Sequence, residues 1–338
     1  MYAPKRGSRL ERIYMKTNNN LTVIIRACGE RTVSVCRRLV EEQVAEEQVF
    51  VISEAPFARA LRRTYEIGIE RHLPWTLAVD ADVLIRDGAV AALLIIAQEL
   101  PEHVFAVQGQ ILDKLSGGPR HGGLKLCRTA MLPHALSCIP PERSAKRPES
   151  HTLGQMGILG FPTLEIDPVL GLHDYEQWHR DTYRKAFFHA HKFADAVHAY
   201  WGPMWARLAR HDNDYQVALL GMKEGLCCDG KVISDVTQFS PEAVTHLLQE
   251  NGLSEKSEFT PGEATGRQIQ EMINAHIPAR EYWSWRLLRH PDAGTGDGIG
   301  GRLRRTVART GWLGLAPYAV GGVMTSLGRR LQSLAKRA

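Results

Sequence analysis

Two aspartates separated by a single residue could hold a divalent metal ion. Within the stretch "PWTLAVDADVLI" of residues 74–85, Asp80 and Asp82 lie at the end of an apolar run. Aspartate is uncommon in strands and costly to bury without a partner. On one extended strand the two carboxylates would point to the same side, and carboxylate oxygens are ligands that Mg²⁺ and Mn²⁺ prefer. The alternative is that the pair only ends a strand and caps the next helix.

The segments around this pair alternate between strand and helix patterns. Apolar runs at residues 21–25, 48–53, 75–85 and 103–112 predict strands, and residues 33–43, 56–71 and 86–100 predict helices. Such alternation indicates an α/β fold whose mixed, mostly parallel sheet is covered by helices. Ligands bind outside the carboxyl ends of the strands in such sheets. Polar residues that would gather there are Arg26, Ser53, Glu54, Asp80 and Asp82.

The second half of the chain is less regular. Residues 116–132 predict a glycine-rich loop, a short strand and a helix, and residues 139–151 predict a polar, proline-rich loop. We expect residues 152–172 to be irregular, residues 174–225 to be helical and residues 240–292 to form short helices. The glycine-rich residues 292–301 have the composition of a linker.

Charge is unevenly distributed along the 338 residues. Residues 298–338 hold eight lysines and arginines and no acidic residue, so the rest of the chain is slightly acidic. This distribution argues against a body that binds nucleic acid. None of the six cysteines forms a C-x-x-C pair, and the N-terminus lacks the apolar core of a secretory signal. We therefore expect reduced cysteines and a cytoplasmic protein.

The basic C-terminal region could contact a membrane. Nineteen uncharged residues lie between Arg309 and Arg329, including five glycines, Trp312 and Tyr318. The stretch is too poor in apolar residues to cross a bilayer. Its aromatic residues and flanking basic residues predict peripheral binding to an anionic surface, such as the inner face of the plasma membrane. The alternative is packing against the body or a second subunit.

Residues 20–180 resemble the nucleotide-sugar half of a GT-A (Rossmann-like) glycosyltransferase, similar to family 2 enzymes. The resemblance rests on the strand and turn of residues 21–32, the strand ending "ISE", the following helix and "W-x-L-x-V-D-A-D-V-L". The segment "GGLKLCRTAML" is similar to the one that shapes the acceptor side. This implies an N-terminal arm (1–20), a GT-A nucleotide-sugar and acceptor domain (21–180), a helical extension (181–292), and a linker with a basic amphipathic tail (293–338).

The resemblance also implies an activity. It predicts metal-dependent transfer, with inversion, of a sugar from a UDP- or GDP-sugar donor to a glycan or lipid-linked acceptor. Asp82 would be the main ligand of Mn²⁺ or Mg²⁺, with Asp80 on the donor and its metal and His173 as a further ligand. The alternative for His173 is a hydrogen-bonded loop histidine. Residues implied to bind the donor are Arg26, Ala27, Cys28, Glu30, Glu54, Asp80 and Ala81.

An inverting transferase also needs a carboxylate that deprotonates the acceptor hydroxyl. The E-D motif that supplies it in family 2 is absent after the acceptor segment. Glu149 in "KRPESH" is the first candidate, although a loop glutamate is usually only solvated, and Asp174 is the second. The Q-x-x-R-W signature of processive synthases is absent too, since Gln177 and Arg180 give only Q-x-x-R.

Three other functions are open to the sequence. A nucleotidyltransferase shares a similar core, but "IIRACGERT" offers one glycine and so few backbone amides for a triphosphate. A haloacid-dehalogenase-type phosphatase carries its D-x-D on the first strand, followed by a threonine. Here the pair follows the third strand and Leu84 takes the threonine's place. The non-enzymatic alternative is a catalytically degenerate, membrane-associated scaffold.

Overall fold

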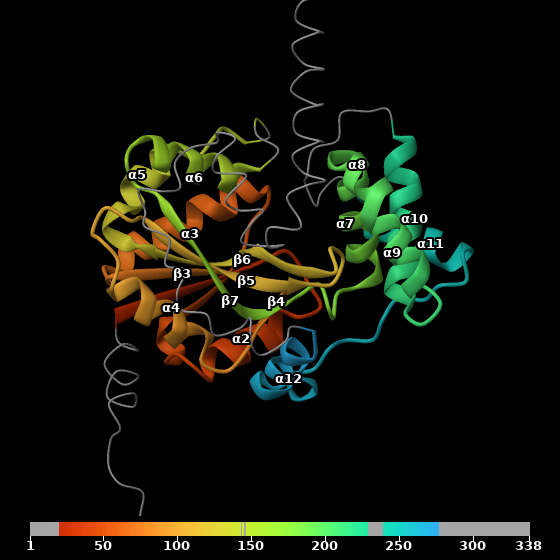
Figure 1. Ribbon diagram of the computed structural model, residues 1–338, viewed down its shortest axis with the longest axis horizontal. Helices are drawn as coiled ribbons and strands as arrows, with labels where there is room; N and C mark the ends of the chain where they lie inside the picture. The colour runs from red at the N-terminus through yellow and green to blue at the C-terminus, as the bar shows by residue number, and fades with distance from the viewer. Residues whose placement is uncertain (1–19, 143, 145–146, 229–238, 277–338) are drawn as a thin grey trace, which may run out of the picture. The chain divides into compact units, whose positions relative to one another are not determined.

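The computed structural model describes residues 20–142, 144, 147–228 and 239–276. Its central element is a seven-stranded sheet with helices around it (Figure 1). The strand order is β2-β1-β3-β6-β5-β7-β4. Five strands run in one direction, while β6 and β4 run opposite to them. The mixed, mostly parallel sheet predicted for a GT-A-like fold is therefore confirmed. The strands are β1 (Leu21–Ala27), β2 (Val49–Ser53), β3 (Trp75–Asp80), β4 (Val83–Ile85), β5 (Ala106–Asp113), β6 (Gly118–Arg128) and β7 (Thr163–His173).

Helices cover both faces of this sheet. Side chains alternate in direction along β1, so Val23 and Ile25 join one core while Ile24 packs with Ile67 on the other face. The first core includes α2 (Val33–Glu41), α4 (Ala89–Gln98) and α12 (Gly266–His276). The opposite face is covered by α3 (Phe57–Arg71), α5 (Leu132–Ser137) and α6 (Pro148–Ile158).

The predicted helical region follows β7. Gly221 and Gly225 let α10 approach α7 closely, because a Cβ at either position would lie 2.3–2.4 Å from a backbone oxygen of α7. The buried Trp205 donates its Nε1–H to the Leu115 carbonyl at 2.7 Å, which connects this region to the turn after β5. The helices are α7 (His179–Lys192), α8 (Ala194–Ala196), α9 (Gly202–Leu208), α10 (Asn213–Cys227) and α11 (Pro241–Glu250).

The prediction of one strand over residues 75–85 was wrong. β3 lies between β1 and β6, whereas β4 pairs with β7 at the far edge of the sheet. The chain turns at Ala81, whose N–H donates to the Arg26 carbonyl at 2.9 Å and whose carbonyl accepts from the Thr32 hydroxyl at 2.7 Å. Asp80 therefore ends one strand and Asp82 precedes another, so they do not share one side of a strand.

The predictions for residues 116–172 were wrong in three places. The glycine-rich stretch continues as β6, which pairs with both β3 and β5, and Gly122 and Gly123 take positive φ values where the pairing with β5 is irregular. Residues 148–158 form α6, with Pro148 at the first helical position, where its missing N–H costs nothing. Residues 163–173 form β7, whose partners are distant in sequence. Glu149 consequently lies in a helix and not in a loop.

Other parts of the sequence-based prediction fall outside the described residues. These are the N-terminal arm up to residue 19 and the linker and basic tail of residues 293–338, with the membrane contact expected there. Among the described residues, no helix combines the length and apolar character that crossing a bilayer requires.

Replacing Gly171 by alanine is expected to lower the free energy of unfolding by about 1–3 kcal/mol. Gly171 lies opposite Ile85 in the pairing of β7 with β4, and a Cβ there would lie 2.6 Å from the Leu84 carbonyl oxygen. Chemical denaturation measures the change. The control is Gly154→Ala in α6, where nothing lies within 4 Å of a Cβ. That helical substitution should be neutral or slightly stabilising. Equal effects of the two changes would contradict the close approach of β4 to β7.

Candidate active site

A cavity of about 750 Å³ opens beside the carboxyl ends of β1, β2 and β3. It collects most residues that the sequence predicted for the site: Arg26, Ala27, Cys28, Glu30, Glu54, Asp80, Asp82, Glu149 and His173. Ala81 and Asp174 are buried, only 1% and 3% exposed, and do not line it. Further lining residues are Lys125 of β6, Arg147 directly before α6, and Lys185 of α7.

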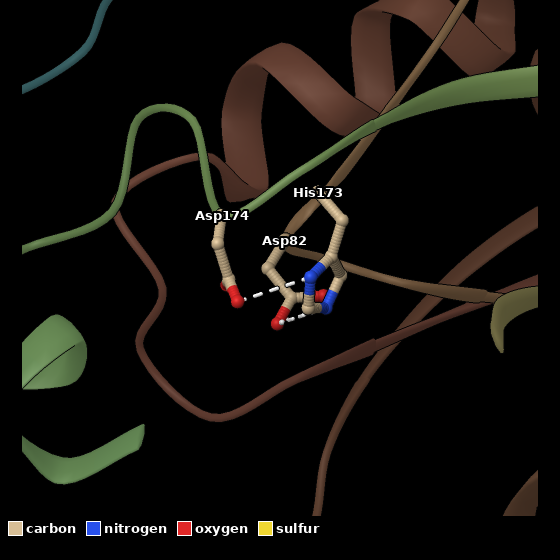
Figure 2. A group of neighbouring side chains, drawn as sticks. All are labelled: Asp82, His173 and Asp174. Atoms are coloured by element: carbon tan, nitrogen blue, oxygen red, sulfur yellow. Dashed lines mark ion pairs between the residues drawn. The ribbon is translucent and has the colours of Figure 1, made fainter. Parts of the chain in front are cut away.

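Asp82, His173 and Asp174 form a group that could hold a metal ion (Figure 2). One ligand atom from each residue lies within 4.8 Å of the other two. His173 Nε2 lies 3.4 Å from Asp82 Oδ2, and His173 Nδ1 lies 3.0 Å from Asp174 Oδ2. The antiparallel pairing of β4 with β7 creates this group, because it places Val83 opposite His173. Asp82 directly precedes Val83, and Asp174 directly follows His173.

Asp113 fixes the orientation of His173. It ends β5 opposite His173 in the pairing of β5 with β7, and its Oδ2 lies 2.9 Å from His173 Nδ1. A metal-binding histidine usually donates its second ring N–H to a carboxylate in this way. Asp113 was not predicted as a site residue, although it directly follows the predicted fourth strand of residues 103–112, at the rim where ligands are expected.

The side chains of Asp82, His173 and Asp174 could bind the predicted divalent ion. Asp82 Oδ1 is buried without a hydrogen-bond partner, so it has lone pairs to offer. Burial alone would raise the pKa of Asp82, but the charges of Lys185 and His173 hold that pKa well below its ordinary value. The carboxylate is therefore ionised, as a metal ligand must be. Burial opposes protonation of His173, but Asp174 and Asp82 raise its pKa well above the ordinary value, so a metal would have to displace the proton of this imidazole. The two carboxylates suit Mg²⁺ or Mn²⁺, and the imidazole adds a nitrogen ligand of the kind that transition metals accept.

Asp80 lies outside this three-residue group. Its Oδ1 accepts from Arg26 Nε at 2.8 Å and lies 2.7 Å from Arg26 Nη2. Burial raises the pKa of Asp80 even though Arg26 opposes the shift. The predicted contact of Asp80 with the metal stays a prediction, and its observed partner is the guanidinium of β1.

Glu149 is bound by two cations. Its Oε1 lies 2.9 Å from Arg26 Nη1, and its Oε2 lies 2.8 Å from Lys125 Nζ. Burial would raise the pKa of Glu149, but Lys125 and Arg26 together lower it to about 2. Asp80, Arg26, Glu149 and Lys125 thus form one chain of ion pairs that joins β3, β1, α6 and β6. Lys125 was missed, although it lies within the segment assigned to the acceptor side.

The predicted donor residues gather at the end of β1. The Cys28 N–H donates to Glu30 Oε2 at 2.5 Å, and the Cys28 thiol donates to the Glu54 carbonyl at 3.3 Å. All three residues line the cavity, so the segments after β1 and β2 form one wall. Phe57 adds an aromatic ring whose centroid lies 4.8 Å from the Arg26 guanidinium carbon.

Glu30→Gln is expected to stabilise the protein above pH 7 by about 1–3 kcal/mol. Burial, assisted by the charge of Asp82, raises the pKa of Glu30 to about 7 from an ordinary value of 4.5. Between these two values the unfolded chain loses the proton first. The contribution of Glu30 to stability therefore falls as the pH rises through this window.

Denaturation of both proteins with chelator present, at pH 4 and pH 8, measures this effect. The two stabilities should nearly coincide at pH 4, where Glu30 is neutral in both states, and differ at pH 8. A constant difference at the two pH values would show that Glu30 does not titrate between them.

No protein-family model matches the chain, and no curated protein resembles it in sequence. Similar solved structures include a glycosyltransferase involved in glycosylation of the major capsid of PBCV-1. Its sequence is 16% identical, the match covers 46% of this chain and 92% of that chain, and the TM-score is 0.35. The mannosyltransferase PcManGT from Pyrobaculum calidifontis, solved with GDP-Man and Mn²⁺, has 15% identity, coverages of 79% and 90% and a TM-score of 0.35. A cytidylyltransferase from Leptospira borgpetersenii has 9% identity, coverages of 58% and 97% and a TM-score of 0.36.

Proposed function

We propose that this protein is a metal-dependent glycosyltransferase. It would transfer a sugar, with inversion, from a UDP- or GDP-sugar to a glycan or lipid-linked acceptor. The observation that carries the proposal is the position of the Asp82, His173 and Asp174 group, which borders a cavity at the carboxyl ends of the strands. Side chains that can bind a divalent ion, together with several nearby cations, suit a substrate that carries a diphosphate.

The roles follow from the positions of the side chains. Asp82, His173 and Asp174 would hold Mn²⁺ or Mg²⁺, and such an ion neutralises charge that grows on a departing diphosphate. Lys125, Arg147 and Lys185 line the cavity and can add positive charge there. Cys28, Glu30 and Glu54 would border the nucleoside, because they form the wall at the ends of β1 and β2.

Glu149 is our proposed base. It lines the cavity, whereas Asp174 is buried and lies against His173 and Lys185. In the free protein its two cations make Glu149 a weak base. A donor diphosphate that draws Lys125 away would return basicity to Glu149, because Lys125 lowers the pKa of Glu149 more than Arg26 does.

A panel of nucleotide-sugars tests the proposal by thermal shift, with and without Mn²⁺. One UDP- or GDP-sugar should stabilise the protein only when Mn²⁺ is present, since a ligand at 100 times its Kd adds about 2.7 kcal/mol. The same compound should be hydrolysed slowly to the nucleoside diphosphate. Release of pyrophosphate from a nucleoside triphosphate would instead identify a nucleotidyltransferase. No response to any nucleotide would indicate a scaffold.

A further inference from the structure

Lys185 places an ammonium group among the side chains that we propose as metal ligands. Its Nζ lies 2.5 Å from Asp82 Oδ2 and also donates to Asp174 Oδ1. The side chain is 18% exposed and lines the cavity, so its ammonium can reach the open space without unfolding of α7. The two carboxylates that would bind a metal are therefore already bound to a cation.

The helix that carries Lys185 is held firmly. The backbone N–H groups of His179 and Arg180, in the first turn of α7, donate to the carboxylate of Glu255 at 2.6 and 3.1 Å. Gly221 and Gly225 of α10 pack directly on the backbone of α7. The position of the Lys185 backbone is thus fixed, while its four-carbon stem keeps rotational freedom.

An ammonium group and a divalent ion compete for the same two carboxylates. Lys185 contacts Asp82 Oδ2 and Asp174 Oδ1, and a divalent ion bound to either carboxylate would lie close enough to the ammonium for the two cations to repel each other strongly. The other cations near the site have different main partners. Arg26 lies between Asp80 and Glu149. Arg120 Nε lies 2.5 Å from Asp113 Oδ2, and Arg120 Nη2 lies 3.1 Å from Nδ1 of His173, which is one of the three proposed ligands. Only Lys185 bridges two of the three proposed ligands within the described part of the chain.

We propose that Lys185 is an exchangeable counter-ion of the metal site. In the free protein its ammonium neutralises Asp82 and Asp174 and competes with the divalent ion. When the donor enters, the ammonium moves to the donor's diphosphate and the metal takes the two carboxylates. This inference rests on the proposed function, because the diphosphate is the anion that receives the ammonium. This exchange of cations makes the binding of metal and nucleotide cooperative. Because such coupling is reciprocal, each of the two should raise the affinity for the other.

Calorimetric titration of the full chain with Mn²⁺, in the absence of nucleotide, tests the competition. Lys185→Met should bind Mn²⁺ at least tenfold more tightly than the wild type, because the competing cation is gone. Lys185→Gln provides a second variant that keeps a polar group for the carboxylates and should change affinity in the same direction. Lys223→Met, at an exposed position of α10, is the matched control and should change nothing. Circular dichroism verifies that each variant is folded.

Repeating the titrations with UDP or GDP tests the exchange. The nucleotide should raise Mn²⁺ affinity by a larger factor in the wild type than in Lys185→Met, because only the wild type must move an ammonium. Equal factors, or an unchanged or lower Mn²⁺ affinity of the folded variants without nucleotide, would overturn the proposal. If Asp82→Asn still abolished Mn²⁺ binding in that case, the proposed metal site would stand. Absence of Mn²⁺ binding in every protein, with or without nucleotide, would reject both ideas.

Discussion

Replacing Asp82 by asparagine is expected to abolish Mn²⁺-dependent donor binding and to lower turnover by roughly 10³-fold or more. A metal ion supplies several kcal/mol of charge stabilisation in a transition state, and each 1.36 kcal/mol corresponds to a factor of ten in rate. Asp82 is central to the proposed group of metal ligands. Its Oδ2 lies 3.4 Å from His173 Nε2, and its Oδ1 is buried without a hydrogen-bond partner. An amide keeps the shape of the side chain and removes the charge that the metal needs.

The same substitution changes stability, so the fold must be checked separately. Asp82 Oδ2 lies 2.5 Å from Lys185 Nζ, and loss of one partner from a buried ion pair is destabilising. Circular dichroism should show a folded variant with a lower unfolding temperature. Asp167→Asn, at an exposed position of β7, serves as the control and should keep both metal binding and activity. Metal-dependent turnover that survives unchanged in Asp82→Asn would remove the basis for the proposed metal site.

The sequence predicted the elements whose signals are local. β1 and β2 are apolar runs, α3 begins after Pro56, and the rim position of Asp80 and Asp82 follows from the alternation of strands and helices. The separation of these two aspartates could not be predicted in this way. It depends on the pairing of β4 with β7, whose strands are almost ninety positions apart, and three residues of β4 carry no signal of their own.

The residues that were missed show the same limit. Asp113 and His173 meet only because β5 pairs with β7, and Lys185 reaches Asp82 only because α7 packs beside the sheet. A lysine within a helical pattern is usually a solvent-exposed residue. The sequence therefore indicated which types of ligand to expect, whereas the charges that surround them appeared only with the tertiary contacts.

Glu149→Gln is expected to lower kcat by roughly 10²–10⁴-fold, the usual contribution of a positioned base. The substitution removes the negative charge of Glu149, whose Oε1 lies 2.9 Å from Arg26 Nη1 and whose Oε2 lies 2.8 Å from Lys125 Nζ. Both cations then become more available to the donor's diphosphate, so donor affinity should be equal to that of the wild type or higher. Steady-state kinetics and donor titration separate the two effects. Glu142→Gln, which alters an exposed ion pair with Arg59, is the control and should be neutral.

The pH dependence of Glu149→Gln reveals whether the ion pairs persist during turnover. With a pKa of about 2, Glu149 is ionised at every pH between 5 and 8. As long as Lys125 stays bound to it, the wild type and the variant should show parallel profiles of kcat over this range. An acidic limb in kcat that is present in the wild type and absent in the variant would mean that Lys125 leaves Glu149 in the complex and raises its pKa. A variant that keeps full kcat but binds donor poorly would instead assign Glu149 to donor binding, with its effect exerted through Arg26.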